Sequence, residues 1–151
     1  MLALVQRVKK AAVLVDAKIV ASIDAGLVVL LGIVDNDTKK DAEYIADKLL
    51  NLRVFPDRDR DQEKEFELSI KEIGGEILLV SQFTLAADCK KGRRPSFSRA
   101  MNQKLAEPIY QYTAAILKKQ ITTHTGIFGA HMEVSLVNDG PVTLIIDSQR
   151  G

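Results

Sequence analysis

Residues 26–34, GLVVLLGIV, are apolar at every position. A strand that is covered on one face alternates apolar and polar residues, whereas a strand covered on both faces carries an unbroken apolar run. The run is far too short to cross a bilayer. It therefore predicts a central strand of a sheet with structure packed on both of its faces.

The flanking segments predict further strands and turns. Runs rich in β-branched and aliphatic residues predict strands at 2–8, 11–16, 19–23, 76–82, 131–137 and 142–147. A turn is expected at Asp16-Ala17-Lys18, and the polar residues 57–65 are expected to form an exposed loop.

Two helices complete the pattern. Thr38 should open the first, because T-K-K-D is a capping-box sequence and apolar residues follow it at helical spacing. The second carries Leu105, Ile109, Tyr112 and Ile116, and Pro108 predicts that it starts late or kinks. Strands with two helices predict a layered α/β fold, and 151 residues are expected to form one domain, 1–151.

Composition limits the classes of function. A formal net charge of +1 argues against a protein that coats DNA or RNA by bulk charge, although a local basic patch remains compatible with it. The single Cys89 excludes an internal disulfide framework and fits a reducing compartment. The N-terminal residues MLALVQRVKK lack the apolar region of a signal peptide. We expect a soluble cytoplasmic protein without a membrane partner.

The stretch VSQFTLAADCKKGRRPSFSRA, residues 80–100, joins a strand end to a basic loop. Polar groups at a strand end either cap loose backbone groups or surround a carbonyl that undergoes acyl chemistry. The loop that follows is either a solvated surface or a phosphate contact made by Lys90, Lys91, Arg93 and Arg94. The residues alone do not decide between capping and acyl chemistry at the strand end. They also do not decide between a solvated surface and a phosphate contact for the loop.

Metal and nucleophile signals are weak. His124 and His131 fit no zinc spacing, so surface or structural roles are favoured and no metal or cofactor is expected. Cys89 has no recognisable base partner. DGPVT, residues 139–143, is an ordinary turn on residue chemistry alone.

Nearly the whole chain, from LVQRV at 4–8 to LIIDS at 144–148, resembles the D-aminoacyl-tRNA deacylase family. The most specific parts are VSQFTL (80–85), KGRRPSFSRA (91–100) and SLVNDGPVT (135–143). The resemblance implies a β-rich mixed, barrel-like fold with two main helices. It also implies a homodimeric hydrolase that cleaves the ester between a D-amino acid and tRNA, rejects the L-ester and thereby proofreads chirality in translation.

The resemblance further implies roles for individual residues. The strand-end motif would line the ester: Ser81, Gln82, Phe83 and Thr84. Chirality would be selected by a cis pair that enters the partner's site, Gly140 and Pro141, which is secured by Arg7. The terminal adenosine would be held by Phe128 and Met132.

Rival functions remain at this stage. A non-catalytic tRNA-binding module could keep the basic loop and lose both the SQFT and GPVT motifs, and a plain dimerisation domain would not need clustered arginines. Thr84 has no visible base beside it in sequence, so a positioning role is favoured, while a nucleophilic role stays open. The sequence does not decide whether glycyl-tRNA is also cleaved.

Overall fold

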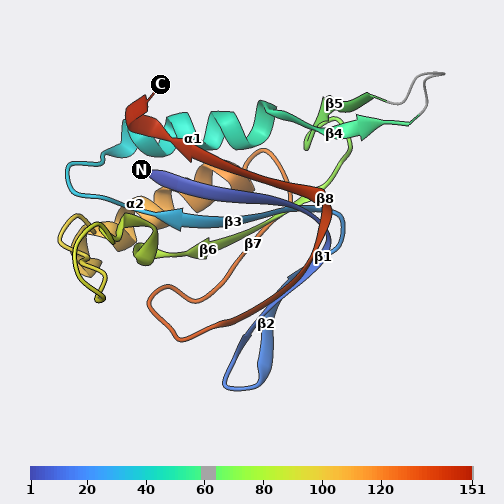
Figure 1. Cartoon of the computed structure of the whole chain (residues 1–151). Helices are drawn as coiled ribbons and strands as arrows, with labels where there is room; N and C mark the ends of the chain where they lie inside the picture. The colour runs from blue at the N-terminus through green and yellow to red at the C-terminus, as the bar shows by residue number, and fades with distance from the viewer. Residues whose placement is uncertain (59–63, 151) are drawn as a thin grey trace.

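The structure, a computed structural model, describes residues 1–58 and 64–150 (Figure 1). One strongly curved, barrel-like sheet has the order β2-β1-β3-β6-β7, and β8 pairs with the other side of β1. Its strands are β1 (Leu2–Val15), β2 (Lys18–Ile23), β3 (Gly26–Gly32), β6 (Glu76–Ser81), β7 (Thr123–Thr125) and β8 (Glu133–Asp147). A separate hairpin is formed by β4 (Arg53–Asp57) and β5 (Lys64–Ser69).

Two main helices, α1 (Lys39–Asn51) and α2 (Gln103–Lys118), pack on the sheet, and two short 3₁₀ helices, η1 (Phe83–Ala86) and η2 (Ser148–Arg150), follow β6 and β8. The predicted α/β class is therefore confirmed. Among the described residues, neither helix is long and apolar enough to cross a membrane.

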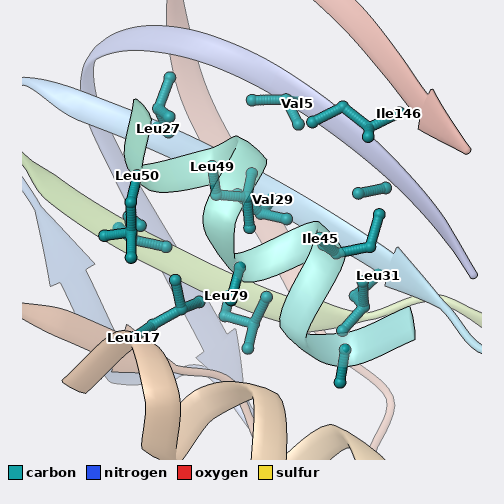
Figure 2. Packing of buried hydrophobic residues seen from close by; sticks show 14 of the residues in the cluster. Val5, Leu27, Val29, Leu31, Ile45, Leu49, Leu50, Leu79, Leu117 and Ile146 are labelled. Atoms are coloured by element: carbon teal, nitrogen blue, oxygen red, sulfur yellow. The ribbon is translucent and has the colours of Figure 1, made fainter. Parts of the chain in front are cut away.

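Strand β3 is covered on both faces, as its apolar sequence predicts. It lies between β1, which is antiparallel to it, and β6, which is parallel. Leu27 and Val29 belong to the cluster that contains Ile45 and Leu49 of α1 (Figure 2). Val28 points to the opposite face and belongs to a second buried cluster. Burial on both sides fixes the position of β3, and β6 beside it runs in the same direction toward the candidate site.

The predicted strands 2–8 and 11–16 are one strand, β1, which corrects the sequence-based division. Exposed Lys9 and Lys10 interrupt the apolar pattern without ending the strand. They lie where β1 exchanges one neighbour for another, since its pairing with β3 ends at Val8 and its pairing with β2 starts at Ala11. The turn expected after it is present, with positive φ angles at Asp16 and Ala17.

Strand β8 is likewise continuous, whereas two strands separated by residues 138–141 are predicted from the sequence. The pairing with β1 jumps from Val8–Asn138 to Gln6–Thr143, so the residues between Asn138 and Thr143 bulge out of the ladder. The Asn138 side chain closes this bulge, because its Oδ1 accepts from Val142 N (3.1 Å) and its Nδ2 donates to Thr143 Oγ1 (2.9 Å). Turn-forming residues here build a bulge instead of a strand break.

Helix α1 starts where the capping box predicts. Thr38 is the N-cap, and its hydroxyl accepts from Lys40 N (3.3 Å). The Asp41 carboxylate accepts from Thr38 N (2.8 Å) and from the Ser148 hydroxyl (2.8 Å). Asp41 therefore joins the start of α1 to the C-terminal segment.

Replacing Asp41 by asparagine should destabilise the fold at neutral pH by about 0.5–1 kcal/mol, the usual size of a capping interaction. Burial alone raises the pKa of Asp41, but hydrogen bonds from Thr38 and Ser148 outweigh it and leave the pKa below its ordinary value. A lowered folded-state pKa stabilises the fold above the unfolded-state pKa, and this stabilisation is lost as pH falls through the folded-state pKa. In urea unfolding, the difference in the free energy of unfolding between Asp41→Asn and wild type should therefore become smaller in acid. A difference that stays constant with pH would contradict this role.

Helix α2 begins at Gln103 and contains Pro108, so the predicted late start is wrong. The Asn102 side chain caps it by accepting from Lys104 N (3.0 Å). Proline at 108 removes the hydrogen bond to the Lys104 carbonyl, which belongs to an exposed residue that water can reach. The buried face is also displaced from the predicted stripe: Leu105 is exposed, and the buried residues are Ala106, Tyr110, Thr113, Ala114 and Leu117.

The segment 57–65 is shorter as a loop than predicted. Asp57 is the last residue of β4, and Lys64 and Glu65 are the first residues of β5. Residues 59–63 lie outside the described residues.

Candidate active site

The SQFT motif stands where β6 leaves the sheet. Ser81 is the last residue of β6, and Gln82 N donates to Leu31 O of β3 (2.8 Å). The chain then turns into η1, so the N–H groups of Phe83 and Thr84 stand in a first helical turn, where no intrahelical acceptor exists for them. Gln82 Nε2 donates to the Thr84 hydroxyl. The strand end thus presents donors and a hydroxyl group outside the core.

A cavity of about 530 Å³ opens beside this strand end. Ser81, Gln82 and Phe83 line it, together with Phe128 and Met132 from the segment between β7 and β8. Five of the residues predicted from the sequence are therefore brought together. Thr84 is not among the lining residues and is exposed in η1. A cavity of this size with mostly apolar walls and a few polar groups is typical of small-molecule sites.

The Phe128 ring is supported by a buried side chain of helix α2. It packs against the Tyr110 ring, with centroids 5.2 Å apart. Tyr110 is buried in α2 and donates its hydroxyl to Leu79 O of β6 (2.9 Å). Burial raises the pKa of Tyr110 far above its ordinary value, so the hydroxyl stays protonated as a donor. Strand β6 and helix α2 therefore fix the wall of the cavity that Phe128 forms.

Sequence reasoning missed part of the lining. Met101, Gln103 and His131 also line the cavity, although His131 was expected to have a surface or structural role. Gln103 is the first residue of α2, and the sequence offers no signal for it beyond the helix start. His131 is adjacent to Met132, which the family resemblance does predict. His124 lies elsewhere, 3.9 Å from Glu76 Oε1.

Arg7 is buried in β1, with a side chain only 3% exposed. Its guanidinium donates to Val54 O (2.8 Å), Asp139 O (3.2 Å) and Glu65 Oε2 (3.2 Å), and Nε lies 3.3 Å from Asp139 Oδ2. A buried guanidinium is tolerated when its donors are satisfied in this way. Arg7 therefore ties the β8 bulge to the β4–β5 hairpin.

Gly140 and Pro141 form the exposed part of the bulge, and the bond between them is cis, as the resemblance predicts. Gly140 has φ +121°, a conformation that L residues rarely adopt. A Cβ at this position would lie 2.8 Å from Val142 Cγ2 and 3.2 Å from Arg7 Nη2. Glycine is therefore required both by backbone conformation and by the approach of Arg7.

The two predicted halves of the site lie at opposite ends of the same sheet. Arg7 pairs with Leu27 near the start of β3, whereas Ser81 pairs with Leu31 near its end. In Figure 1, η1 and the yellow basic loop lie at the left end of the sheet, and β8 bends at the right end. Within one chain, the Gly140–Pro141 pair does not reach the cavity.

The basic loop is exposed and lies beside the strand end. Asp88 and Ser96 close it through two backbone hydrogen bonds of 2.8 and 2.9 Å. Within the part of the chain that the structure describes, its four cations form no ion pair: Lys90, Lys91, Arg93 and Arg94. Their charge is therefore free to meet an anionic partner. Cys89 is exposed next to them.

Across residues 1–58 and 64–150, no group of three or more His, Cys, Asp or Glu side chains could hold a metal ion. The described residues thus offer groups for orientation and hydrogen bonding: an amide and hydroxyl pair at Gln82 and Thr84, backbone N–H groups, and an aromatic and thioether wall. Such groups can position an ester and stabilise the negative charge that develops on its carbonyl oxygen.

Comparisons with known proteins agree with this geometry. A family model described as D-Tyr-tRNA(Tyr) deacylase matches residues 4–147. A protein of Clostridium acetobutylicum named D-aminoacyl-tRNA deacylase is 47% identical over 151 residues, which cover 99% of both chains. One of the same name from Thermus aquaticus is 51% identical over 149 residues, covering 98% of this chain and 95% of that protein.

Two solved structures share the fold. One, named c-Myc DNA Unwinding Element Binding Protein, superposes with a TM-score of 0.91 at 41% identity and covers 97% of this chain and 98% of its own. The other, described as a probable eukaryotic D-amino acid tRNA deacylase, has a TM-score of 0.83 at 17% identity, with 96% and 97% covered, and supports the fold alone. On the family model and the curated relatives, the chain belongs to the D-Tyr-tRNA(Tyr) deacylase family.

Proposed function

We propose that this protein is a hydrolase that cleaves the ester between a D-amino acid and the terminal ribose of tRNA, and that it rejects the L-ester. The observation that carries the proposal is the cavity at the end of β6, which Ser81, Gln82 and Phe83 of the SQFT motif line together with Phe128 and Met132. Its volume of about 530 Å³ falls within the range of sites that enclose a small ligand, here the aminoacyl group and the adenosine that carries it.

The proposed reaction does not need a nucleophilic side chain of the protein. Water adds to the ester carbonyl carbon, the bond to the ribose oxygen breaks, and that oxygen takes a proton to become the free 3′-hydroxyl of tRNA. The amino acid leaves as a carboxylate, and the second proton of the water passes to the solvent. Because an aminoacyl ester is reactive and stands beside a ribose 2′-hydroxyl, positioning and oxyanion stabilisation can supply the acceleration.

Thr84 is assigned a positioning role. Its oxygen already accepts from Gln82 Nε2, so its proton can be donated onward, to a water or to the substrate. Ser81, Gln82 and Phe83, the cavity-lining residues nearest to it in sequence, offer no base, and the His131 imidazole that lines the same cavity forms no hydrogen bond with Thr84 among the described residues. Gln82 fixes the hydroxyl, and the backbone N–H groups of Phe83 and Thr84 are the candidate donors for the oxyanion.

Chiral selection requires a homodimer in this proposal. The Gly140–Pro141 pair is exposed but lies at the far end of the sheet from the cavity of its own chain. A two-fold axis would carry the pair of one subunit to the cavity of the other. There its carbonyls would accept from the amino group of a D-residue, whereas an L-residue would direct its side chain against them. Arg7 holds the pair through Asp139.

The remaining partner is tRNA. The four cations of the basic loop, which form no ion pair among the described residues, suit phosphate groups, and their loop follows the strand end that lines the cavity. The proposal includes neither a DNA nor a membrane partner, needs no cofactor and places the protein in the cytoplasm, where charged tRNA is used. Glycyl-tRNA, whose aminoacyl group has no side chain to clash with the carbonyls, is a further expected substrate.

The test is deacylation of D-tyrosyl-tRNA by purified protein, with and without a metal chelator. We expect release of free tyrosine and intact tRNA at the same rate in both arms. Tight tRNA binding without ester hydrolysis would instead indicate a binding module. Activity that is lost in chelator and restored by a metal would contradict the positioning mechanism.

A further inference from the structure

Two phenylalanine rings lie exposed beside the cavity. The side chain of Phe83 is 58% exposed and that of Phe97 is 38% exposed. Their centroids lie 5.1 Å apart and the rings meet edge to face at 66°. Neither ring belongs to the buried clusters of the core. The pair therefore contributes an aromatic surface that core packing does not explain.

The position of the pair links two features of the site. Phe83 lines the cavity itself. Phe97 stands on the basic loop, next to the Asp88–Ser96 bridge that closes it. A strand that leaves the cavity over Phe83 would therefore meet the Phe97 ring, which stands on the loop that also carries the cations.

Exposed aromatic rings beside unpaired cations are the usual means of holding single-stranded nucleic acid, because bases stack on the rings while cations neutralise the phosphates. We propose that Phe97, supported by Phe83, is a stacking platform for an unpaired nucleotide of the tRNA 3′ end, immediately outside the cavity. The loop cations hold the adjoining phosphates. This inference rests on the proposed function, since it assumes that tRNA is the substrate.

Charge favours this occupant over a second copy of the chain. Lys90, Lys91, Arg93 and Arg94 lie on the same loop as Phe97 and have no carboxylate partner among the described residues. A polyanion neutralises them on contact, whereas a protein surface would have to supply matching acidic groups. The platform has no sequence requirement of its own, because every base has a face that can stack.

The experiment measures the binding of uncharged tRNA, so it does not depend on hydrolysis. Phe97→Leu should weaken binding about fivefold or more, as expected for the loss of one stacked base. Phe97→Trp should keep the affinity of wild type. Removal of the single-stranded 3′ nucleotides from the tRNA should abolish the difference between Phe97→Leu and wild type.

Salt dependence supplies the matched control. Phe97→Leu should leave the slope of log affinity against log salt unchanged, because it removes no charge. Neutralising Lys91 and Arg93 together, as Lys91→Gln and Arg93→Gln, should flatten that slope by about one unit for each phosphate that is no longer neutralised. The two kinds of variant thus separate stacking from charge.

The outcomes distinguish this inference from the proposed function. Wild-type affinity in Phe97→Leu, or no tRNA binding by wild type, would overturn the platform. A change in oligomeric state on sedimentation of Phe97→Leu would assign the rings to an interface between copies and also overturn it. Normal stacking behaviour without any hydrolysis of D-aminoacyl-tRNA would overturn the proposed function and leave the platform in place.

Discussion

Replacing Gly140 by alanine should lower kcat/KM for D-tyrosyl-tRNA by about 100-fold or more, the usual cost of misplacing a group at a reacting centre by about 1 Å. The added Cβ would lie 2.8 Å from Val142 Cγ2, 3.0 Å from Val142 N and 3.2 Å from Arg7 Nη2. Two of these atoms belong to the bulge and the third holds it, so the carbonyls of the pair must move. Steady-state kinetics on purified protein measures the effect.

Gly74→Ala is the matched control. Gly74 also has a positive φ, +61°, but a Cβ there would meet nothing within 4 Å. Both substitutions introduce backbone strain, on the order of 1–3 kcal/mol. Only Gly140→Ala should impair catalysis at temperatures where both variants are folded. Equal activity of the two variants would remove the Gly140–Pro141 pair from the mechanism.

Mixed dimers extend the same test to the proposed sharing of the site. Gly140→Ala subunits are combined with Phe128→Ala subunits, which lack the aromatic wall of the cavity, and each variant should have low activity alone. In a two-fold dimer with shared sites, one site of each mixed dimer is intact, so equal mixing should restore about a quarter of the wild-type activity. No recovery after subunit exchange, with exchange verified by mass spectrometry, would mean that each chain contains its whole site.

The second large effect is expected from the substrate. Replacing the terminal 2′-hydroxyl of D-aminoacyl-tRNA by hydrogen should lower the enzymatic rate by about 100-fold or more, the scale of a lost acid–base or orienting group. Thr84→Ala should cost much less, because in the proposed mechanism the Thr84 hydroxyl orients rather than attacks. Each rate is divided by the uncatalysed hydrolysis of the same ester, since the 2′-hydroxyl also affects that background.

The opposite ranking would identify Thr84 as the nucleophile. Complete loss of activity in Thr84→Ala, with a 2′-deoxy substrate still cleaved, is the pattern that a covalent intermediate on Thr84 would give. Mass spectrometry of wild type quenched during turnover would then detect an acyl group on Thr84. Gln82→Ala serves as the control, because it removes the donor to the Thr84 oxygen while leaving the hydroxyl itself in place.

Local rules predicted the elements that depend on local interactions. The capping box at Thr38 and the apolar run that forms β3 were both confirmed, because capping and two-sided burial depend on adjacent residues. The divisions of β1 and β8 were wrong for a shared reason. Lys9 and Lys10 mark a change of neighbouring strand, and residues 138–141 mark a bulge, and neither event is distinguishable from a strand end in sequence alone.

The sequence likewise predicts only some of the residues of the site. The SQFT motif, Phe128 and Met132 were expected in one site on the strength of the family resemblance. The fold brings five of these six residues around one cavity, and Thr84 is the exception. Met101, Gln103 and His131 join that cavity only through tertiary packing, so no local pattern marks them. The separation of Gly140 from the cavity is also a property of the folded sheet, since it follows from strand register.

Stereospecificity tests the central claim most directly. The measurement is kcat/KM for hydrolysis of D-tyrosyl-tRNA and L-tyrosyl-tRNA by the same preparation, on the same tRNA. The two esters contain the same bonds and differ only in the configuration at the Cα atom of the amino acid. We predict fast release of D-tyrosine and an L-ester hydrolysed at close to its uncatalysed rate. Equal hydrolysis of the two esters would contradict the account.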